Sequence, residues 1–402
     1  MKTSRTIPET LDARLAVMQR PRERSWGRAT VFIALLALAT GRALAQGFNA
    51  GSTNALGDVV IAENTTVDLP PDGKLHYKSL KVSANVRLNF RRNVRNTPVF
   101  ILSQGDVIVD GIIDVNGAAP GPNSAGIGGP GGFDGGKPGF GPEAPPGSGY
   151  GPGGSGGGDG NCNSSSAGGG SYGSVGNGRG GAVYGSILLI PIVGGSGGGG
   201  GEGQPGGGGG GGGGAILIAA NTRVVINGAV ESFGGGNSTC FNGGSGGAIR
   251  LVATKVEGAG RVDVRPGGSG GFGRIRVDTI DRTNLRFQFL NNSVTTVGGN
   301  MLSFPPLIPQ LATVEAAGNV IPLGSGPVTF NLPIDSTTNR TVKIQARDFG
   351  RMVPIRVTLT PDSGLPVIVD GQIDNTKDNP AFVVLPVTVP VNTLVTVHCW
   401  TR

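Results

Sequence analysis

The stretch Gly243–Ala253 reads Gly-Gly-Ser-Gly-Gly-Ala-Ile-Arg-Leu-Val-Ala, so a glycine cluster runs directly into an apolar segment. Related stretches occur at Gly211–Ala219, which reads Gly-Gly-Gly-Gly-Ala-Ile-Leu-Ile-Ala, and at Gly267–Val277, which reads Gly-Gly-Ser-Gly-Gly-Phe-Gly-Arg-Ile-Arg-Val. The stretch at 243–253 continues into a second apolar run around a turn dipeptide at residues 256–262, and the stretch at 211–219 does the same at residues 224–230. Short β-branched runs bounded by glycine are typical of strands. The pattern therefore predicts an all-β protein.

The apolar runs repeat along the chain. Two copies begin at Ala215 and Ala248, 33 residues apart, and an earlier copy without the glycine cluster begins at Val99. A period of 20 to 50 residues is typical of a solenoid, in which each coil buries its apolar face against its neighbours. We therefore expect a parallel β-helix or β-solenoid-like body, with N-terminal β coils over 46–116 and β-helix-like repeats over 215–304.

Between these parts, 46 of the 98 residues from 117 to 214 are glycine. One interpretation is a flexible coil, because glycine loses the most backbone entropy on ordering and has no side chain to bury. The other is a bundle of extended threefold polyglycine-II helices, which approach closely because they have no Cβ atoms. The apolar island Tyr184–Val193 favours order in at least part of this glycine-rich insertion.

A separate domain is expected over 305–402, after the stiff segment Pro305-Pro306-Leu307-Ile308-Pro309. Six short alternating runs predict an antiparallel β-sandwich of immunoglobulin or fibronectin type. They lie at 328–332, 341–346, 355–359, 367–369, 382–385 and 394–397.

The first 45 residues are typical of a secretory signal peptide. Ala29–Ala39 is an apolar segment too short to span a bilayer, and Ala43-Leu44-Ala45 has the form of a cleavage site. Arginines precede the apolar segment, and translation from Met18 would give a signal of ordinary length. We expect a secreted or cell-surface protein with no transmembrane segment once the signal has been removed.

Charge gives no reason to expect nucleic acid as a partner. The full chain has a formal net charge of +7, but residues 1–45 hold eight Lys or Arg and three Asp or Glu, which leaves about +2. The local cluster of Arg87, Arg91, Arg92 and Arg95 is interpreted as a charged strand edge that discourages pairing with other sheets.

Three cysteines fit an oxidising compartment with one disulfide. Cys162 and Cys240 lie in similar polar surroundings within the glycine-rich region, and we predict that they pair. Cys399 is then free, with a role that the sequence does not indicate.

Few side chains suggest catalysis. The only histidines, His76 and His398, lie near opposite ends of the exported chain, which argues against a histidine-based triad or metal site. Asp106, Asp110 and Asp114 are a candidate calcium site or a carboxylate cluster acting on carbohydrate, although turn aspartates commonly face solvent. We predict no catalytic residue and no cofactor.

The glycine-rich region also carries isolated aromatic residues, which could stack on carbohydrate or plug the ends of a bundle. They are Phe133, Phe140, Tyr150, Tyr172, Tyr184, Phe233 and Phe241.

The glycine-linked repeats and the signal resemble uncharacterised, glycine-rich secreted bacterial proteins with β-helix-like repeats. The glycine-rich region is also similar in composition to the polyglycine-II regions of phage tail-tip adhesins and of anaplastic-lymphoma-kinase-type receptors. These resemblances imply recognition or scaffolding without enzymatic activity, and no functional residue is carried over from low-complexity sequence.

Three functional hypotheses follow from the sequence. The first is an exported, non-enzymatic structural or adhesive protein, with an extracellular polysaccharide or another cell-surface molecule as its partner. The second is a carbohydrate-binding or carbohydrate-active β-helix protein that uses the three aspartates. The third is a cell-envelope assembly component that docks through its C-terminal domain. The oligomeric state is not indicated.

Overall fold

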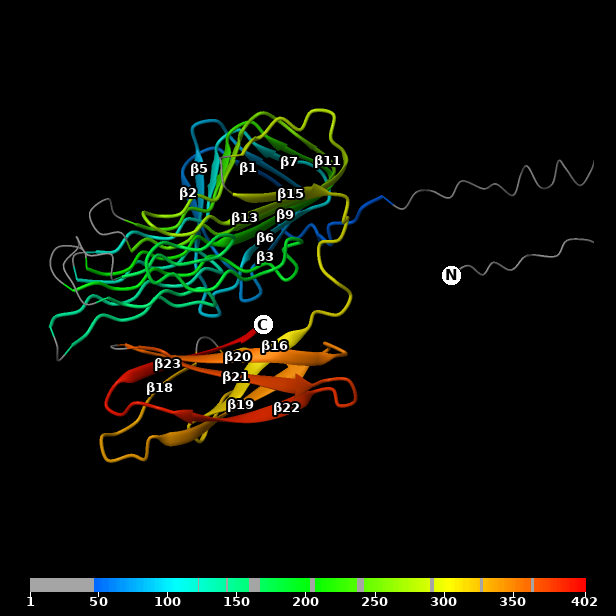
Figure 1. The fold of residues 1–402 in the computed structure, drawn as a ribbon. Coiled ribbons are helices and arrows are strands. Elements are labelled where there is room, and N and C mark those ends of the chain that lie inside the picture. Colours follow the sequence, from blue (N-terminus) through cyan, green and yellow to red (C-terminus); the bar gives the residue numbers. More distant parts are fainter. Residues whose placement is uncertain are drawn as a thin grey trace, which may run out of the picture. The chain divides into compact units, whose positions relative to one another are not determined.

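The computed structural model describes residues 47–121, 123–141, 144–158, 167–202, 207–236, 242–289, 293–325, 328–362 and 365–402. Contacts divide the chain into two units, Met1–Gly47 and Phe48–Arg402, and the second unit is described below. Its regular elements are all β-strands (Figure 1). Within the described ranges there is no helix long and apolar enough to cross a membrane.

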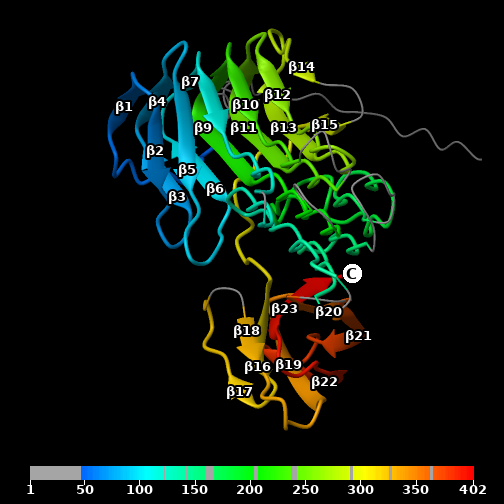
Figure 2. The same ribbon diagram turned by 90° about the vertical axis from the view of Figure 1, so that its left-hand side faces the viewer.

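The first part of this unit contains two parallel sheets. Sheet A has nine strands: β1 (Asp58–Ile61), β3 (Lys74–Tyr77), β4 (Ser79–Val82), β6 (Val99–Ser103), β7 (Val107–Val109), β9 (Ala215–Ile226), β11 (Ala248–Glu257), β13 (Arg274–Asp281) and β15 (Val294–Gly298). Sheet B has six: β2 (Thr65–Asp68), β5 (Arg87–Arg91), β8 (Ile112–Asp114), β10 (Ala229–Glu231), β12 (Arg261–Asp263) and β14 (Gln288–Phe289). Figure 2 shows β1 and β2 at one end of the row of strands and β14 and β15 at the other. The two sheets together are called the parallel-sheet body below.

The two sheets share one apolar core. Alternation decides which side chains face it: β5 reads Arg-Leu-Asn-Phe-Arg, and only Leu88 and Phe90 are buried. Leu88 from sheet B and Leu80 and Ile218 from sheet A belong to the same buried cluster. The register of the strands therefore follows from the apolar faces that must meet.

The C-terminal part contains two antiparallel sheets of four strands, called the C-terminal sheets below. They are formed by β16 (Gln310–Ala316), β17 (Asn319–Val320), β19 (Asn339–Arg347) and β22 (Ala381–Thr388), and by β18 (Val328–Asn331), β20 (Met352–Pro361), β21 (Val367–Asp374) and β23 (Leu394–Thr401). A second buried cluster draws on both sheets, including Val342 and Ile344 of β19 and Val357 of β20. The strands β16 and β17 were not predicted, because the proline-rich segment before them indicated a linker.

The predicted fold class is wrong in its specific terms. An all-β chain is present, but it forms parallel sheets and small antiparallel sheets, and neither a β-helix solenoid nor an immunoglobulin-like or fibronectin-like domain describes it. The spacing between Ala215, Ala248 and Arg274, which begin β9, β11 and β13, is uneven, although the three strands pair in parallel with these residues in register. In addition, β9 pairs with β6 along its first half and with β7 along its second half. The chain between β8 and β9, residues 115–214, is almost entirely the glycine-rich region.

Candidate functional site: a hydrogen-bonded glycine bundle

The glycine segment 209–214 lies at the centre of a set of extended glycine-rich segments. Each of its six backbone N–H groups donates to a carbonyl oxygen of another segment, at 2.7–3.0 Å. The acceptors repeat every three residues: Gly209 and Gly212 donate to Gly136 and Phe133, Gly210 and Gly213 to Asn242 and Ser245, and Gly211 and Gly214 to Ala118 and Val115. Residues three apart thus bond the same neighbouring segment.

The carbonyl oxygens of the same segment accept in a matching pattern. Gly126 and Gly129 donate to Gly209 and Gly212, Gly198 and Gly195 to Gly210 and Gly213, and Gly235 and the Ser232 hydroxyl to Gly211 and Gly214. Six surrounding segments therefore share the hydrogen bonds of one central segment. Three residues per turn is the geometry of polyglycine II, and here it satisfies backbone groups that would be costly to bury unpaired. These glycine-rich segments and their neighbours are called the glycine bundle below.

The absence of Cβ atoms is what allows this packing. A Cβ placed on Gly210 would lie 1.8 Å from the carbonyl oxygen of Gly235, and one on Gly212 would lie 2.0 Å from that of Gly195. Both distances are far inside van der Waals contact, and the obstructing atoms are backbone. The bundle is therefore held together by backbone atoms, and its glycines are required by their surroundings.

Buried serines fill the few positions where a side chain fits. Ser155 accepts a hydrogen bond from the backbone N–H of Gly199 at 2.7 Å, and Ser245 accepts one from that of Ser196 at 2.8 Å. Ser196 in turn accepts from the N–H of Gly153 at 3.0 Å. These hydroxyls link segments that are distant in sequence, and each gives a buried backbone N–H group a hydrogen-bond partner.

An aromatic pair lies where the glycine bundle meets sheet A. The rings of Tyr172 and Tyr184 are 4.7 Å apart, and Tyr172 packs with Leu189 and with Ala215 of β9. The Tyr184 hydroxyl donates to the carbonyl of Gly194 at 2.6 Å and accepts from Ser196 at 2.9 Å. Burial raises the pKa of both tyrosines above the ordinary value, so both stay neutral. The contacts of these two rings favour the interpretation in which aromatic side chains plug the end of the bundle over the one in which they stack on carbohydrate.

The other predicted aromatic residues differ in exposure. Phe133, Tyr150 and Phe233 are half-buried, whereas 62% of Phe140 is exposed, which leaves its ring available to a partner. Phe241 lies outside the described residues, as do both cysteines of the predicted Cys162–Cys240 disulfide. Cys399 is a free thiol, and burial raises its pKa to about 12, which keeps it protonated and unreactive.

Three carboxylates lie in register across sheet B where its strands enter the bundle. Asp114 of β8 is directly opposite Glu231 of β10, which is directly opposite Asp263 of β12. Such like charges repel, and three arginines offset them. Arg87 binds Asp114 and Glu231, Arg261 binds Glu231, and Arg265 lies 3.0 Å from Asp263. Burial nevertheless raises the pKa of Asp263.

The three predicted aspartates are thus placed in different surroundings. Asp106 accepts from Thr222 at 2.5 Å and from Arg223 at 2.7 Å, whereas Asp110 accepts from Asn227 at 2.8 Å. Asp114 belongs to the carboxylate row of sheet B. No group of three or more His, Cys, Asp or Glu residues within the described ranges is arranged to hold a metal ion. The structure does not bring the three aspartates together as one site.

Glu231 and Asp263 were missed by sequence reasoning, although a signal for them exists. Asp114, Glu231 and Asp263 each follow a buried Ile or Val at the end of a second apolar run, so aligning the repeats puts one acid at the same position in each. Arg87 and Arg261 share one register position, two residues before that of the acids, but only the pairing of the strands in sheet B shows that Arg87 lies close to Asp114 and Glu231.

Comparisons of the chain with protein-family models, with curated proteins and with solved structures give no match. The geometry of the glycine bundle and its surface must therefore support any functional conclusion.

Proposed function

We propose that the protein is an exported, non-enzymatic structural or adhesive protein of the cell surface or extracellular space. The observation that carries this proposal is the glycine bundle, in which a central segment is hydrogen-bonded to six others. Ordering glycine costs more backbone entropy than ordering any other residue, so a chain that nevertheless builds such a bundle gains a rigid, closely packed support.

The surface of the bundle supports an adhesive role. Large apolar side chains project from it into solvent: Ile127, Phe140, Val175, Val183, Ile187 and Leu188. Exposed apolar groups on a rigid support lose little entropy on binding, which favours recognition of a partner. We propose an extracellular polysaccharide as that partner, because rings such as that of Phe140 stack on the apolar faces of sugar units.

A bead-adhesion assay tests this function. Beads coated with the protein exported from the full 402-residue chain would be applied to surfaces coated with cellulose, chitin or alginate, and retention under flow would be measured against albumin-coated beads. We expect retention on at least one surface, reduced several-fold by Phe140→Ser together with Ile127→Ser. Val94→Ser is the matched control, because Val94 is 86% exposed and lies outside the bundle. Retention no greater than that of albumin on all three surfaces, or retention unaffected by the bundle variants, would refute the proposed role.

A further inference from the structure

The parallel-sheet body has unpaired strand edges at both ends. Within the described ranges β1 pairs only with β4 and β2 only with β5, whereas at the other end β15 pairs only with β13 and β14 only with β12. Figure 2 shows these edge strands at opposite ends of the row. An unpaired edge presents free N–H and C=O groups to which another strand can pair.

The apolar core is also open at the same two ends. Val59 and Ile61 of β1 and Val67 of β2 are in register with buried core residues but are themselves only partly buried. At the far end, Phe289 is likewise partly buried and Val297 is 39% exposed, although each is in register with a buried valine. Each end therefore presents a core cross-section that another layer would cover.

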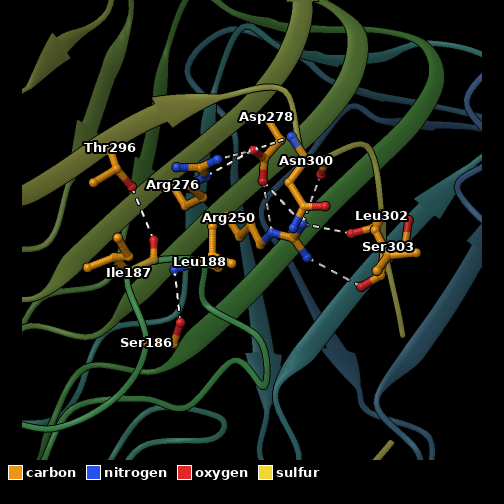
Figure 3. A network of polar contacts seen from close by, with 10 residues as sticks. All are labelled: Ser186, Ile187, Leu188, Arg250, Arg276, Asp278, Thr296, Asn300, Leu302 and Ser303. Carbon is orange, nitrogen blue, oxygen red and sulfur yellow. Dashed lines mark hydrogen bonds and ion pairs between the residues drawn. The ribbon is translucent and has the colours of Figure 1, made fainter. Parts of the chain in front are cut away.

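The chain that leaves the last strand does not cover this end. Residues 299–304, called the strap below, turn back over the outer face of sheet A, where Arg250 of β11 holds them (Figure 3). The Arg250 guanidinium donates to the carbonyls of Asn300, Leu302 and Ser303, at 2.7–3.4 Å. It also forms an ion pair with buried Asp278 of β13 at 3.1 Å, so the buried guanidinium has both a charged partner and carbonyl acceptors in the strap.

Apolar contacts continue the strap across the same face. Phe304 packs edge-on against Phe100 of β6, with ring centroids 5.2 Å apart. The first residues of the unit lie there too: Phe48 and Ala50 belong to the same cluster, and the Ala50 N–H donates to Asn221 of β9 at 2.7 Å. The strap therefore occupies the outer face of sheet A, whereas residues 52–56 run on beside β3, where the Leu56 N–H donates to the carbonyl of His76 at 2.8 Å. Within the described ranges the outer edges of β1, β2, β14 and β15 have no strand partner.

Unpaired side chains of opposite charge lie at the two ends. Residues 48–73 contain four acidic residues and no Lys or Arg; Asp58, Asp68 and Asp72 form ion pairs with Lys78, Arg91 and Lys74, whereas Glu63 forms none within the described ranges. Residues 282–304 contain Arg282 and Arg286 and no Asp or Glu. Both arginines are exposed, and within the described ranges neither has an ion-pair partner. Contact between unlike ends is favoured by this charge, whereas contact between two β1 ends brings acids together.

We propose that copies of this chain associate head to tail, with the β14–β15 end of one copy stacked on the β1–β2 end of the next. All strands of the body are parallel, so the next copy adds its strands in the same direction and extends both sheets and the core. Such a contact joins two different surfaces and does not close on itself, so it produces open filaments. The proposal goes beyond adhesion and does not depend on any ligand.

Sedimentation velocity of the exported protein over a range of concentrations tests the association. We expect a mean mass that rises with concentration without stopping at the dimer and falls as salt is added, together with end-to-end rods by negative-stain electron microscopy. Arg282→Glu combined with Arg286→Glu should weaken association roughly tenfold or more, because two like-charged ends then meet. Lys377→Glu is the matched control, since it reverses an exposed charge in the C-terminal sheets and should leave the mass unchanged.

Three results would overturn the proposal. A monomer at every concentration means that the ends do not bind one another. A species that stops at the dimer indicates a symmetric contact. Association that survives the double arginine reversal, in a variant with unchanged circular dichroism, indicates that another surface is responsible. Bead adhesion is measured separately at concentrations where the protein is monomeric, so failure of either proposal leaves the other standing.

Discussion

The parallel-sheet body and the glycine bundle are both closely packed, but different atoms do the packing. In the body, side chains such as Leu88 and Ile218 fill the space between two sheets, and their shapes can be exchanged to some extent. In the bundle, backbone carbonyls lie where a Cβ would be, so even one added methyl group has no space. The comparison shows that a chain lacking apolar side chains can still build a specific interior if its backbone hydrogen bonds are complete.

The sharpest test of this difference is a single methyl group in the bundle. We expect Gly210→Ala to lower the free energy of unfolding by about 4 kcal/mol or more, because the new Cβ meets the carbonyl oxygen of Gly235 and backbone must move. Urea denaturation followed by circular dichroism measures this loss. Gly299→Ala is the control, since nothing lies within 4 Å of the added Cβ there. Equal stability of the two variants would contradict a backbone-packed bundle.

The parallel-sheet body, unlike the bundle, should tolerate a change in side-chain shape as long as the volume is nearly kept. Leu88→Ala removes a fully buried side chain from the shared core and should cost about 3 kcal/mol. Leu88→Met, which nearly conserves volume, should cost less than about 1.5 kcal/mol. Val94→Ala, at an 86% exposed position, is the control for handling and expression. If Leu88→Met were as damaging as Leu88→Ala, the body would be as intolerant as the bundle, and the contrast between them would fail.

Acid should act where the C-terminal sheets meet the bundle, because His398 of β23 packs against Phe133 and Tyr150 of the bundle. Burial lowers the pKa of His398 on β23 to about 4, from 6.5. The folded state therefore binds fewer protons than the unfolded state between these values, and stability should fall as pH drops from about 6.5 towards 4. Between pH 7 and 4.5 the expected loss is about 2.5 kcal/mol.

Trp400 reports on this region, because its ring stacks on His398 at 5.0 Å and it is the only tryptophan after residue 45. Urea midpoints read from its fluorescence at both pH values measure the loss. His398→Phe should remove most of this pH dependence. A pH dependence that persists unchanged in His398→Phe would assign the effect to other groups.

Local features could be predicted from the sequence, whereas long-range arrangement could not. The runs around Phe100, Ile216 and Ile249 form strands because their β-branched and apolar residues fit a buried sheet, and a glycine cluster precedes the last two. The arrangement of the strands in two parallel sheets could not be foreseen, because β9 divides its pairing between β6 and β7, and that choice depends on the whole sheet. The repeated motif indicated stacking but did not define its geometry.

The same limit applies to the candidate site. Composition left the glycine region open between coil and bundle, because each glycine is identical and only the set of six neighbours decides. Ser196 illustrates this: its neighbours Gly153 and Ser245 are 43 and 49 residues away in sequence. Asp114 was noticed as a turn aspartate, but its row with Glu231 and Asp263 requires the parallel register of β8, β10 and β12.

The smallest expected effect concerns the junction between the two kinds of packing. Tyr184→Phe removes a hydroxyl that donates to Gly194 and accepts from Ser196, and leaves a buried carbonyl in the bundle without this partner. We expect a loss of about 1 kcal/mol, together with faster amide hydrogen exchange in peptides covering residues 194–200. Tyr172→Phe is the matched control, because its hydroxyl has no side-chain hydrogen bond within the described ranges and its ring packing is kept. If both variants lost equal stability, ring packing alone would join the bundle to sheet A. A loss confined to Tyr184→Phe, with exchange rising only in the bundle, would show that backbone hydrogen bonding there depends on a side chain at its edge.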